Sequence, residues 1–204
     1  MVKVSAILLG AGESKRMGLN KLSLPWKKKT VLQHCLGTLT RSEVDEVIVV
    51  LGERSKRMED QYKGPKVRVI MNRHSSWGIS SSIQRGVKSV SPNSEGILIA
   101  LGDMPFLRGK TVNSLIRAFV RGEGGIVVPS FEKRRGHPVI FHRRYMRELL
   151  KLKGDAGAKS IVERHGEDVR VIPVRSAGVL KDIDTPGDYP YPLSRRANLC
   201  RSLE

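Results

Sequence analysis

Apolar residues occur along this chain in short, nearly uninterrupted runs, separated by segments in which apolar positions recur at helical spacing. Runs of this kind are typical of strands buried on both faces, and the intervening spacing is typical of amphipathic helices. Strands that alternate with helices favour right-handed βαβ crossovers and a mostly parallel sheet. Strands are predicted at residues 4–10, 44–51, 66–71, 96–102, 125–129, 139–141 and 168–174.

The segments between these runs supply the predicted helices. Residues 30–40 place their apolar side chains on one helical face, and Thr30 is a suitable N-cap for them. Residues 53–62 are highly charged, so a helix there is expected to be exposed. Further helices are predicted at residues 79–90, 110–120, 143–152 and 154–165.

The length of 204 residues favours one domain with a substantial core. We expect this domain to occupy residues 1–189. A divergent basic tail, residues 190–204, is expected to follow, because Pro190 and Pro192 oppose a regular helix there.

The charge balance indicates an anionic partner. Lysine and arginine total 37 against 20 acidic residues, which gives a formal charge of +17. The basic residues are scattered along the chain and aromatic residues make up only 5%, so a platform for single-stranded nucleic acid is not indicated. A basic RNA-binding or regulatory module is the non-enzyme alternative.

Two features concern the expected cellular compartment. The cysteines Cys35 and Cys200 are too few for a disulfide framework or a zinc ligand set, which favours the reducing cytoplasm. The chain enters its first predicted strand without a charged leader, and no apolar run approaches the length of a membrane span. A cytoplasmic protein without a membrane partner is therefore expected.

The loop after the first strand, up to residue 21, combines glycines with cations. Glycines let backbone N–H groups approach a bulky group closely, and the cations indicate that this group is an anion. Neither the dinucleotide fingerprint nor the P-loop spacing is present. The residues concerned are Gly10, Gly12, Gly18, Lys15, Arg16 and Lys21.

The pattern LxAGxSxRMGxNKLxLP in this loop resembles the nucleotidyltransferases that attach a nucleotide to molybdopterin, most closely the molybdenum cofactor cytidylyltransferases. The motifs WGISSS, LGDMP, RGHPVIF, GDAGAK and DIDTP follow in the family order. The resemblance implies a single-domain, three-layer αβα Rossmann-like nucleotidyltransferase fold. It also implies Mg²⁺-dependent transfer of CMP from CTP to the terminal phosphate of molybdopterin, with release of pyrophosphate. The partners it implies are CTP, molybdopterin or Mo-molybdopterin, and a molybdoenzyme or its chaperone.

The resemblance also implies roles for residues of the first loop. Lys21 would hold the α-phosphate, and Arg16 would contact the departing β- and γ-phosphates. Nucleotide contacts are expected from Leu9, Gly10, Ala11 and Gly12. Ala11 stands where guanylyl relatives usually carry glycine, so CTP is favoured and GTP is the alternative.

Ligands of parallel sheets gather at the carboxyl ends of strands, where Gly10, Gly52 and Asn72 are expected. Ser80 and Ser81 follow at a predicted helix start, where ordinary capping competes with a nucleotide contact. The resemblance favours a contact with the base.

Three aspartates are candidate metal ligands. Asp103 follows the most uninterrupted predicted strand, where a carboxylate is poorly solvated unless it faces a cleft or a cation. The alternative is that it caps the next helix. Asp182 and Asp184 should point to the same side of an extended stretch, with Ile183 directed into the core. Asp103 and Asp184 are the expected Mg²⁺ ligands, with Asp182 as the alternative second ligand.

The acceptor side is predicted around RGHPVIF and GDAGAK. The resemblance places the basic loop at Arg135 and His137 beside the pterin phosphate, although such a loop is more often simply solvated. His137 is equally compatible with a buried hydrogen-bonding role, and Asp155 with either a helix cap or a substrate contact. Another small phosphorylated acceptor is the alternative substrate.

Overall fold

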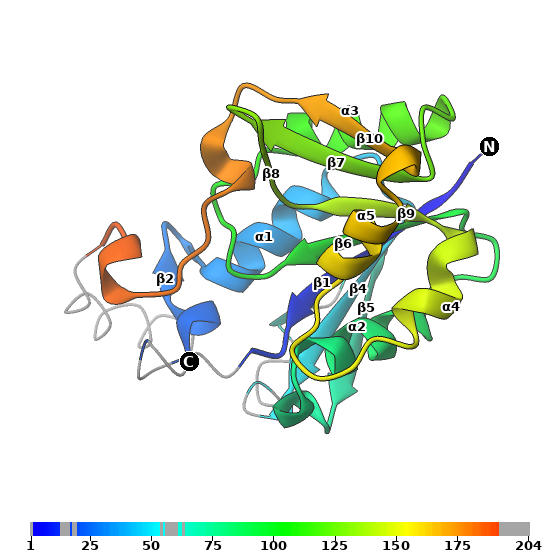
Figure 1. Ribbon diagram of the computed structural model, residues 1–204. Coiled ribbons are helices and arrows are strands. Elements are labelled where there is room, and N and C mark those ends of the chain that lie inside the picture. The colour runs from blue at the N-terminus through cyan, green and yellow to red at the C-terminus, as the bar shows by residue number, and fades with distance from the viewer. Residues whose placement is uncertain are drawn as a thin grey trace.

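A central β-sheet runs through the protein (Figure 1). The computed structural model describes residues 2–12, 17, 20–53, 55, 61–62 and 64–191. Arg16, most of the predicted helix at 53–62 and the tail from residue 192 lie outside these residues. Among the described residues, no helix combines the length and the apolar character needed to cross a membrane.

The sheet has the strand order β10-β7-β9-β6-β1-β4-β5, and β8 pairs with the end of β7. β1 lies parallel between β4 and β6, with Leu9 aligned with Val50 on one side and Leu101 on the other. This register brings the carboxyl ends of the three strands to one edge. The strands are β1 (Val4–Gly10), β4 (Glu46–Gly52), β5 (Val67–Asn72), β6 (Gly96–Leu101), β7 (Ile126–Phe131), β8 (Arg134–Arg135), β9 (Val139–His142) and β10 (Val169–Pro173).

The predicted mostly parallel sheet is confirmed, with β9 as the main exception. β9 lies antiparallel to both β6 and β7. The chain reverses directly after β7, where Glu132 and Lys133 adopt positive φ angles, and β8 pairs back onto Ser130 and Phe131. A turn this short joins only antiparallel strands, because a parallel connection requires a crossover of a dozen or more residues.

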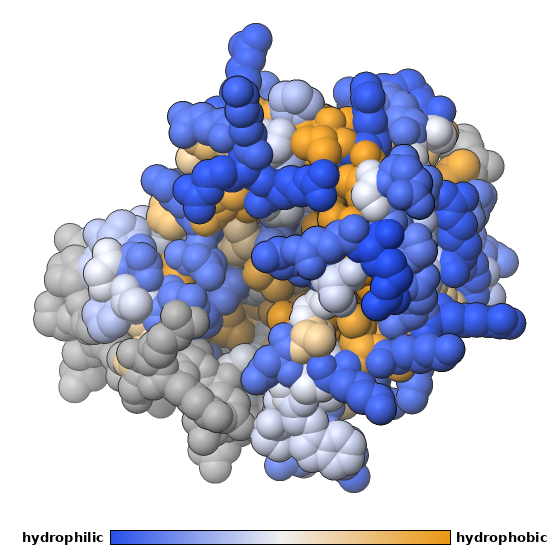
Figure 2. Space-filling view, viewed as in Figure 1, coloured by the Kyte–Doolittle hydropathy of each residue, from blue (hydrophilic) through white to orange (hydrophobic). Residues whose placement is uncertain are grey.

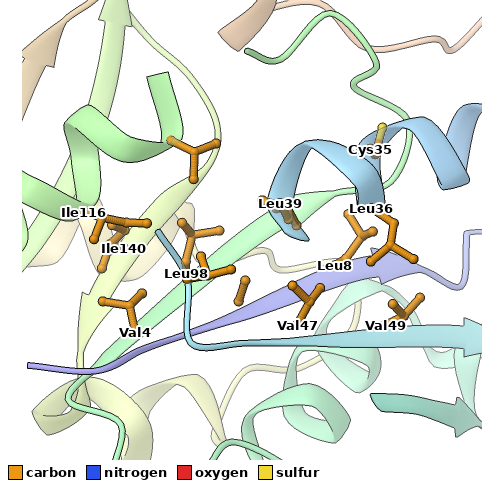
Figure 3. Packing of buried hydrophobic residues seen from close by; sticks show 14 of the residues in the cluster. Val4, Leu8, Cys35, Leu36, Leu39, Val47, Val49, Leu98, Ile116 and Ile140 are labelled. Atoms are coloured by element: carbon orange, nitrogen blue, oxygen red, sulfur yellow. The ribbon is translucent and has the colours of Figure 1, made fainter. Parts of the chain in front are cut away.

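Helices cover both faces of the sheet. α1 (Val31–Thr40) and α3 (Gly109–Val120) pack on one face, while α2 (Ile79–Val87), α4 (Met146–Leu149) and α5 (Lys159–Arg164) pack on the other (Figure 1). In Figure 3, Leu36 and Leu39 of α1 lie over Leu8 and Val49 of the sheet. Alternate residues of β1 enter the two core clusters, so the three-layer αβα arrangement is confirmed.

Several helix boundaries differ from the predictions. α1 begins as predicted, because the Thr30 and Gln33 side chains form a reciprocal capping box. α2 ends at Val87 rather than at residue 90, ahead of Pro92, which cannot continue a helix. The segment predicted as a helix at 143–152 is a 3-10 turn, η5 (Arg143–Tyr145), followed by the short α4. α5 begins only at Lys159, because the chain turns at Gly154, which has a positive φ angle, and is not helical again until residue 159.

Candidate functional site

A cavity of about 420 Å³ opens at the carboxyl ends of β1 and β6. We call it the acidic cavity, because three aspartates are among its lining residues. The backbone around it comes from the end of β1, the 3-10 turn η2 (Lys21–Ser23), the turn η4 (Ser75–Trp77) and the start of α2. The lining residues are Leu9, Ala11, Gly12, Lys21, Leu22, Ser75, Ser76, Gly78, Ile79, Ser82, Leu101, Asp103, Asp155 and Asp184.

Lys21 is held over this cavity by the local structure of η2. The Asn20 side chain accepts a hydrogen bond of 3.1 Å from the Leu22 N–H and so caps the turn. Leu22 is buried in the core, which fixes the base of the turn. The Lys21 Nζ lies 2.6 Å from Asp103 Oδ2 and 2.7 Å from Asp184 Oδ1, and its side chain is only 11% exposed.

The charge state of Lys21 follows from these contacts. Burial lowers the pKa of Lys21, but the charges and hydrogen bonds of Asp103 and Asp184 outweigh burial and raise it above its usual value. The ammonium group is therefore charged at neutral pH. It links two carboxylates that come from distant parts of the chain.

Asp103 stands just beyond β6, at the centre of the sheet. Its backbone oxygen accepts a hydrogen bond of 2.9 Å from the Ile183 N–H, which ties the strand end to the segment that carries the other aspartates. The alternative that Asp103 caps the next helix is wrong, because the N-cap of α3 is Arg108.

The segment from Asp182 to Asp184 has the geometry expected from its sequence. Ile183 is fully buried in a third core cluster, and Asp182 and Asp184 extend to the other side. One ligand atom each from Asp103, Asp182 and Asp184 lie within 4.8 Å of one another. The Asp188 side chain accepts hydrogen bonds from the N–H groups of Asp184 and Thr185 at 3.1 and 2.7 Å, which fixes the turn after the cluster.

These three carboxylates fit a divalent cation that prefers oxygen ligands, as Mg²⁺ and Mn²⁺ do. The buried Oδ1 of Asp103 has no hydrogen-bond partner among the described residues, so it is an oxygen available to a ligand. Partial burial, together with the charges of Asp184 and Asp103, raises the pKa of Asp182. A divalent cation would relieve the repulsion between these groups.

An aromatic cluster holds the acidic segment against the rest of the domain. Trp26 of the hairpin β2 (Pro25–Trp26) and β3 (Lys29–Thr30) packs against Phe106, Tyr189 and Tyr191, with ring centroids 5.1 to 6.5 Å apart. The Tyr189 hydroxyl donates a hydrogen bond to the Pro25 carbonyl. Packing therefore continues through Tyr191, although the domain boundary at residue 189 stays a prediction.

The serine-rich segment reaches the acidic cavity through other serines than those predicted. Ser75, Ser76 and Ser82 line the cavity, whereas Ser80 and Ser81 do not appear among its lining residues. The Ser80 N–H donates to the Gly154 carbonyl, and the Ser81 hydroxyl donates to the carbonyls of His74 and Gly78. Neither serine caps α2 through its side chain, because the N-cap is Gly78.

Asn72 and the glycines at the strand ends stabilise the structure around the acidic cavity through internal contacts. The Asn72 amide is buried and donates to the hydroxyls of Ser81 and Ser82 at 2.9 and 3.0 Å. A Cβ on Gly10 would lie 3.1 Å from Leu32, and one on Gly52 would lie 3.1 Å from the Ala11 carbonyl. These glycines thus allow close internal packing, while Leu9, Ala11 and Gly12 line the cavity itself.

A second cavity, of about 260 Å³, adjoins the first. We call it the apolar cavity; it lies between β9, α2 and α5 and shares Leu9, Ile79 and Leu101 with the acidic cavity. Figure 2 shows apolar residues in the middle of this face, surrounded by a hydrophilic surface. Arg135 and His137, both predicted on the acceptor side, line it together with Lys159 and Glu163.

His137 brings an unusual polar atom to this apolar environment. Its Nδ1 is buried without a hydrogen-bond partner among the described residues, while its backbone N–H donates to the Val179 carbonyl at 2.9 Å. Burial lowers the pKa of His137, although the charge of Asp103 opposes this effect. The ring is therefore neutral at pH 7.

Asp155 lines the acidic cavity rather than the apolar one, and it does not cap α5, whose N-cap is Ala158. Its loop lies against Gly78, which has a φ angle of +95°. A Cβ on Gly78 would lie 2.4 Å from the Gly154 carbonyl group and 2.6 Å from the Asp155 Oδ1. This close approach brings the start of α2 and the Asp155 loop together over the cavity.

A comparison with known protein families shows which family has this sequence pattern. The MobA-like NTP transferase domain matches residues 6–169. The chain belongs to this family. The resemblance found in the motifs is thereby confirmed, and the protein is a nucleotidyltransferase of the MobA-like type.

Relatives of this MobA-like protein carry different names. Purine catabolism protein PucB of Bacillus subtilis (strain 168) is 31% identical over 192 residues, which cover 90% of this chain and 92% of PucB. Molybdenum cofactor cytidylyltransferase of Escherichia coli (strain K12) is 24% identical over 190 residues, which cover 93% and 95% of the two chains. The structure of Rv0371c from Mycobacterium tuberculosis H37Rv in complex with manganese is similar with a TM-score of 0.77 and 26% identity, covering 92% and 96% of the chains.

Within this MobA-like domain, sequence analysis missed part of the acidic cavity. The missed lining residues are Leu22, Ser75, Ser76, Gly78, Ile79, Ser82 and Leu101. Ser75, Ser76, Gly78, Ile79 and Ser82 fall within or beside motifs that the resemblance did single out. Leu22 and Leu101 also lie within quoted motifs, LxAGxSxRMGxNKLxLP and LGDMP, but they were not assigned to the site, because an apolar side chain at a cavity wall cannot be distinguished by sequence from one in the core.

Proposed function

We propose that this protein transfers CMP from CTP to the terminal phosphate of molybdopterin and releases pyrophosphate. The observation that carries the proposal is the meeting of Lys21 with Asp103 and Asp184 in the acidic cavity, with Asp182 beside them, next to a second, apolar cavity. A cation and a metal-binding cluster suit a triphosphate, and an adjoining cavity suits a separate acceptor.

The donor nucleotide belongs in the acidic cavity. Its volume of about 420 Å³ is in the range of small-ligand sites. The backbone at Ala11 and Gly12 lines the cavity close to Lys21, which we assign to the α-phosphate. Asp103 and Asp184, with Asp182 beside them, would hold Mg²⁺, which would neutralise charge on the triphosphate and on the departing pyrophosphate.

The reaction needs alignment more than a protein nucleophile. An oxygen of the acceptor phosphate forms a bond with the α-phosphorus, and the bond from that phosphorus to the β-phosphate oxygen breaks. The acceptor oxygen is already anionic, so no side chain has to remove a proton from it. Lys21 stabilises the charge that develops on the α-phosphate, and Arg16 is assigned to the leaving pyrophosphate.

The acceptor belongs in the apolar cavity. Apolar walls from Leu9, Ile79 and Leu101 suit the flat ring system of a pterin, and Arg135 and Lys159 supply positive charge for its phosphate. The shared wall brings an acceptor phosphate toward Lys21 and Asp103. The name of the Escherichia coli relative supports this acceptor, whereas the name PucB makes another small acceptor the competing possibility.

CTP is the proposed donor because of Ala11, which is buried at the wall of the acidic cavity. A methyl group at this point reduces the room for a purine. Its effect is limited, since one such contact discriminates by about 1–3 kcal/mol. GTP is therefore the alternative donor.

The test is pyrophosphate release measured with each of the four nucleoside triphosphates, with and without molybdopterin. We expect release with CTP, only when both Mg²⁺ and molybdopterin are present. Release with GTP and with none of the other three nucleoside triphosphates would mean that the protein transfers GMP rather than CMP. No release with any of the four in the presence of molybdopterin would reject this acceptor.

A further inference from the structure

The position of Lys21 raises a question about how the metal enters the site. Its Nζ lies 2.6 Å from Asp103 Oδ2 and 2.7 Å from Asp184 Oδ1, so it contacts an oxygen from two of the three aspartates that form the cluster. The Lys21 side chain is only 11% exposed, and those of Asp103 and Asp184 are 18% and 27% exposed. Water therefore screens these contacts only in part.

A divalent cation and this ammonium group need the same carboxylates. Mg²⁺ binds oxygen at roughly 2.0–2.1 Å, so a metal on an oxygen that Lys21 already contacts would lie next to the ammonium charge, and the two cations would repel each other. The free Oδ1 of Asp103 could still bind a metal. A cation at that oxygen would nevertheless lie close to the Lys21 charge, where repulsion opposes binding.

We propose that Lys21 holds the place of the metal in the protein without nucleotide, and that the triphosphate brings the metal in by attracting Lys21 away from Asp103 and Asp184. This inference rests on the proposed function. A triphosphate in the acidic cavity offers Lys21 anionic oxygens in place of the carboxylates. Once Lys21 moves, Asp103 and Asp184 regain oxygens for the metal that accompanies the nucleotide.

The alternative is that Lys21 never opposes the metal. In that case a cation would bind through Asp182 and the free Asp103 oxygen, with the Lys21 contacts unchanged. The two possibilities differ in one property. If Lys21 competes, its removal strengthens metal binding and weakens nucleotide binding; if it does not, metal binding stays the same.

The test measures Mn²⁺ binding by electron paramagnetic resonance in the absence of nucleotide. We expect Lys21→Met to bind Mn²⁺ about tenfold or more tightly than the wild type, because an opposing charge at contact distance is removed. Lys21→Arg, which keeps the charge, should bind Mn²⁺ as weakly as the wild type. Equal Mn²⁺ affinity in the wild type and Lys21→Met would overturn the proposal.

Lys181→Met is the matched control for the loss of one positive charge. Lys181 precedes Asp182 in the chain, but its Nζ lies 5.9 Å above the Phe106 ring. Its removal should change Mn²⁺ affinity less than about threefold, the scale of a screened surface charge. If Lys181→Met raised the Mn²⁺ affinity as much as Lys21→Met, the effect would come from net charge alone, and the assignment to Lys21 would be overturned.

Circular dichroism shows whether Lys21→Met folds. If it does not fold, a second measurement on the wild type still tests the proposal. In the wild type, CTP in the presence of EDTA should raise the melting temperature more than MnCl₂ at the same concentration. The opposite order would contradict the proposal. The pyrophosphate assay tests the proposed reaction independently. If the protein transfers CMP but fails these binding tests, only the competition between Lys21 and the metal is rejected. If it passes the binding tests but transfers no CMP, only the proposed reaction is rejected.

Discussion

At the residue scale, the acidic cavity depends on a few side chains whose positions are fixed by their neighbours. Lys21 is held by a capped turn, Asp103 by a central strand end, and Asp184 by the buried Ile183 beside it. Each functional group is thus attached to a rigid part of the fold. Substitutions that keep the shape of such a side chain should alter chemistry before they alter folding.

Asp103→Asn tests the central carboxylate. Loss of its charge should lower turnover by about 10²-fold or more, the scale for one group that stabilises transition-state charge. The melting temperature should change little, because the amide keeps the size of the side chain. Steady-state pyrophosphate release and thermal melts measure the two effects. Asp168 lies away from the acidic cavity, between β7 and β10, so the control Asp168→Asn should leave turnover unchanged. Near-normal turnover of Asp103→Asn would show that Asp103 takes no part in the mechanism.

Ala11→Gly tests the choice of base. Removal of the methyl group at the wall of the acidic cavity should relax the preference of kcat/KM for CTP over GTP by about tenfold, near the lower limit for one methyl-sized contact. Competition assays with both nucleotides give this ratio directly. Ala156→Gly, at an exposed position outside both cavities, is the matched control. A ratio that stays the same in Ala11→Gly would mean that another part of the cavity selects the base.

At the element scale, the site is assembled where secondary-structure elements approach one another without side chains between them. η4 and the start of α2 meet the Gly154–Asp155 turn at Gly78, whose missing Cβ leaves room for the Gly154 carbonyl. The contact is reinforced by the Ser80 N–H, which donates to that carbonyl at 3.2 Å. The approach of these two elements sets the width of the acidic cavity.

Gly78→Ala should disturb this junction. The new Cβ would meet the Gly154 carbonyl group at 2.4 Å, and alanine disfavours the φ angle of +95°. We expect a loss of about 1–3 kcal/mol of stability, together with a higher KM for CTP as the two elements separate. Chemical denaturation and initial rates measure these quantities. Gly166→Ala is the control, since a Cβ there meets nothing within 4 Å; similar behaviour of the two variants would refute the steric argument.

At the scale of the whole molecule, the sequence predicted the layers and the meeting of the aspartates better than the details. The apolar runs located the described strands except the two-residue strands β2, β3 and β8, and alternation placed Ile183 in the core with its aspartates opposite. The strand β9 was predicted but its antiparallel direction was not, because that direction depends on the short turn after β7 rather than on the pattern of β9 itself. The lining serines were missed because helix phase decides which of them face the cavity, and α2 begins after Gly78 with the Ser81 hydroxyl used internally.

The edge of the sheet provides a prediction about stability as a function of pH. Asp168, just before β10, accepts hydrogen bonds from Arg144, the Tyr145 hydroxyl and, at 3.0 Å, the Gly125 N–H. Partial burial raises the pKa of Asp168, but these three donors outweigh burial and hold it at about 2. Asp168 therefore joins β10, β7 and η5 only while it is ionised.

Because the folded protein lowers this pKa below the value of about 3.9 in an unfolded chain, the stabilisation is present above that pH and is lost as the pH falls toward 2. Asp168→Asn should lower the free energy of unfolding by about 1–2 kcal/mol at pH 7, a figure reduced for the partial exposure of the pair. In urea titrations, the difference from the wild type should shrink as the pH falls from about 4 toward 2, since Asp168 of the unfolded wild type takes up a proton at a higher pH than Asp168 of the folded protein. Glu163→Gln, whose partner Lys159 lies 3.5 Å away on an exposed helix face, should cost much less. A difference that stays constant over this pH range would show that Asp168 acts through its shape and not through its charge.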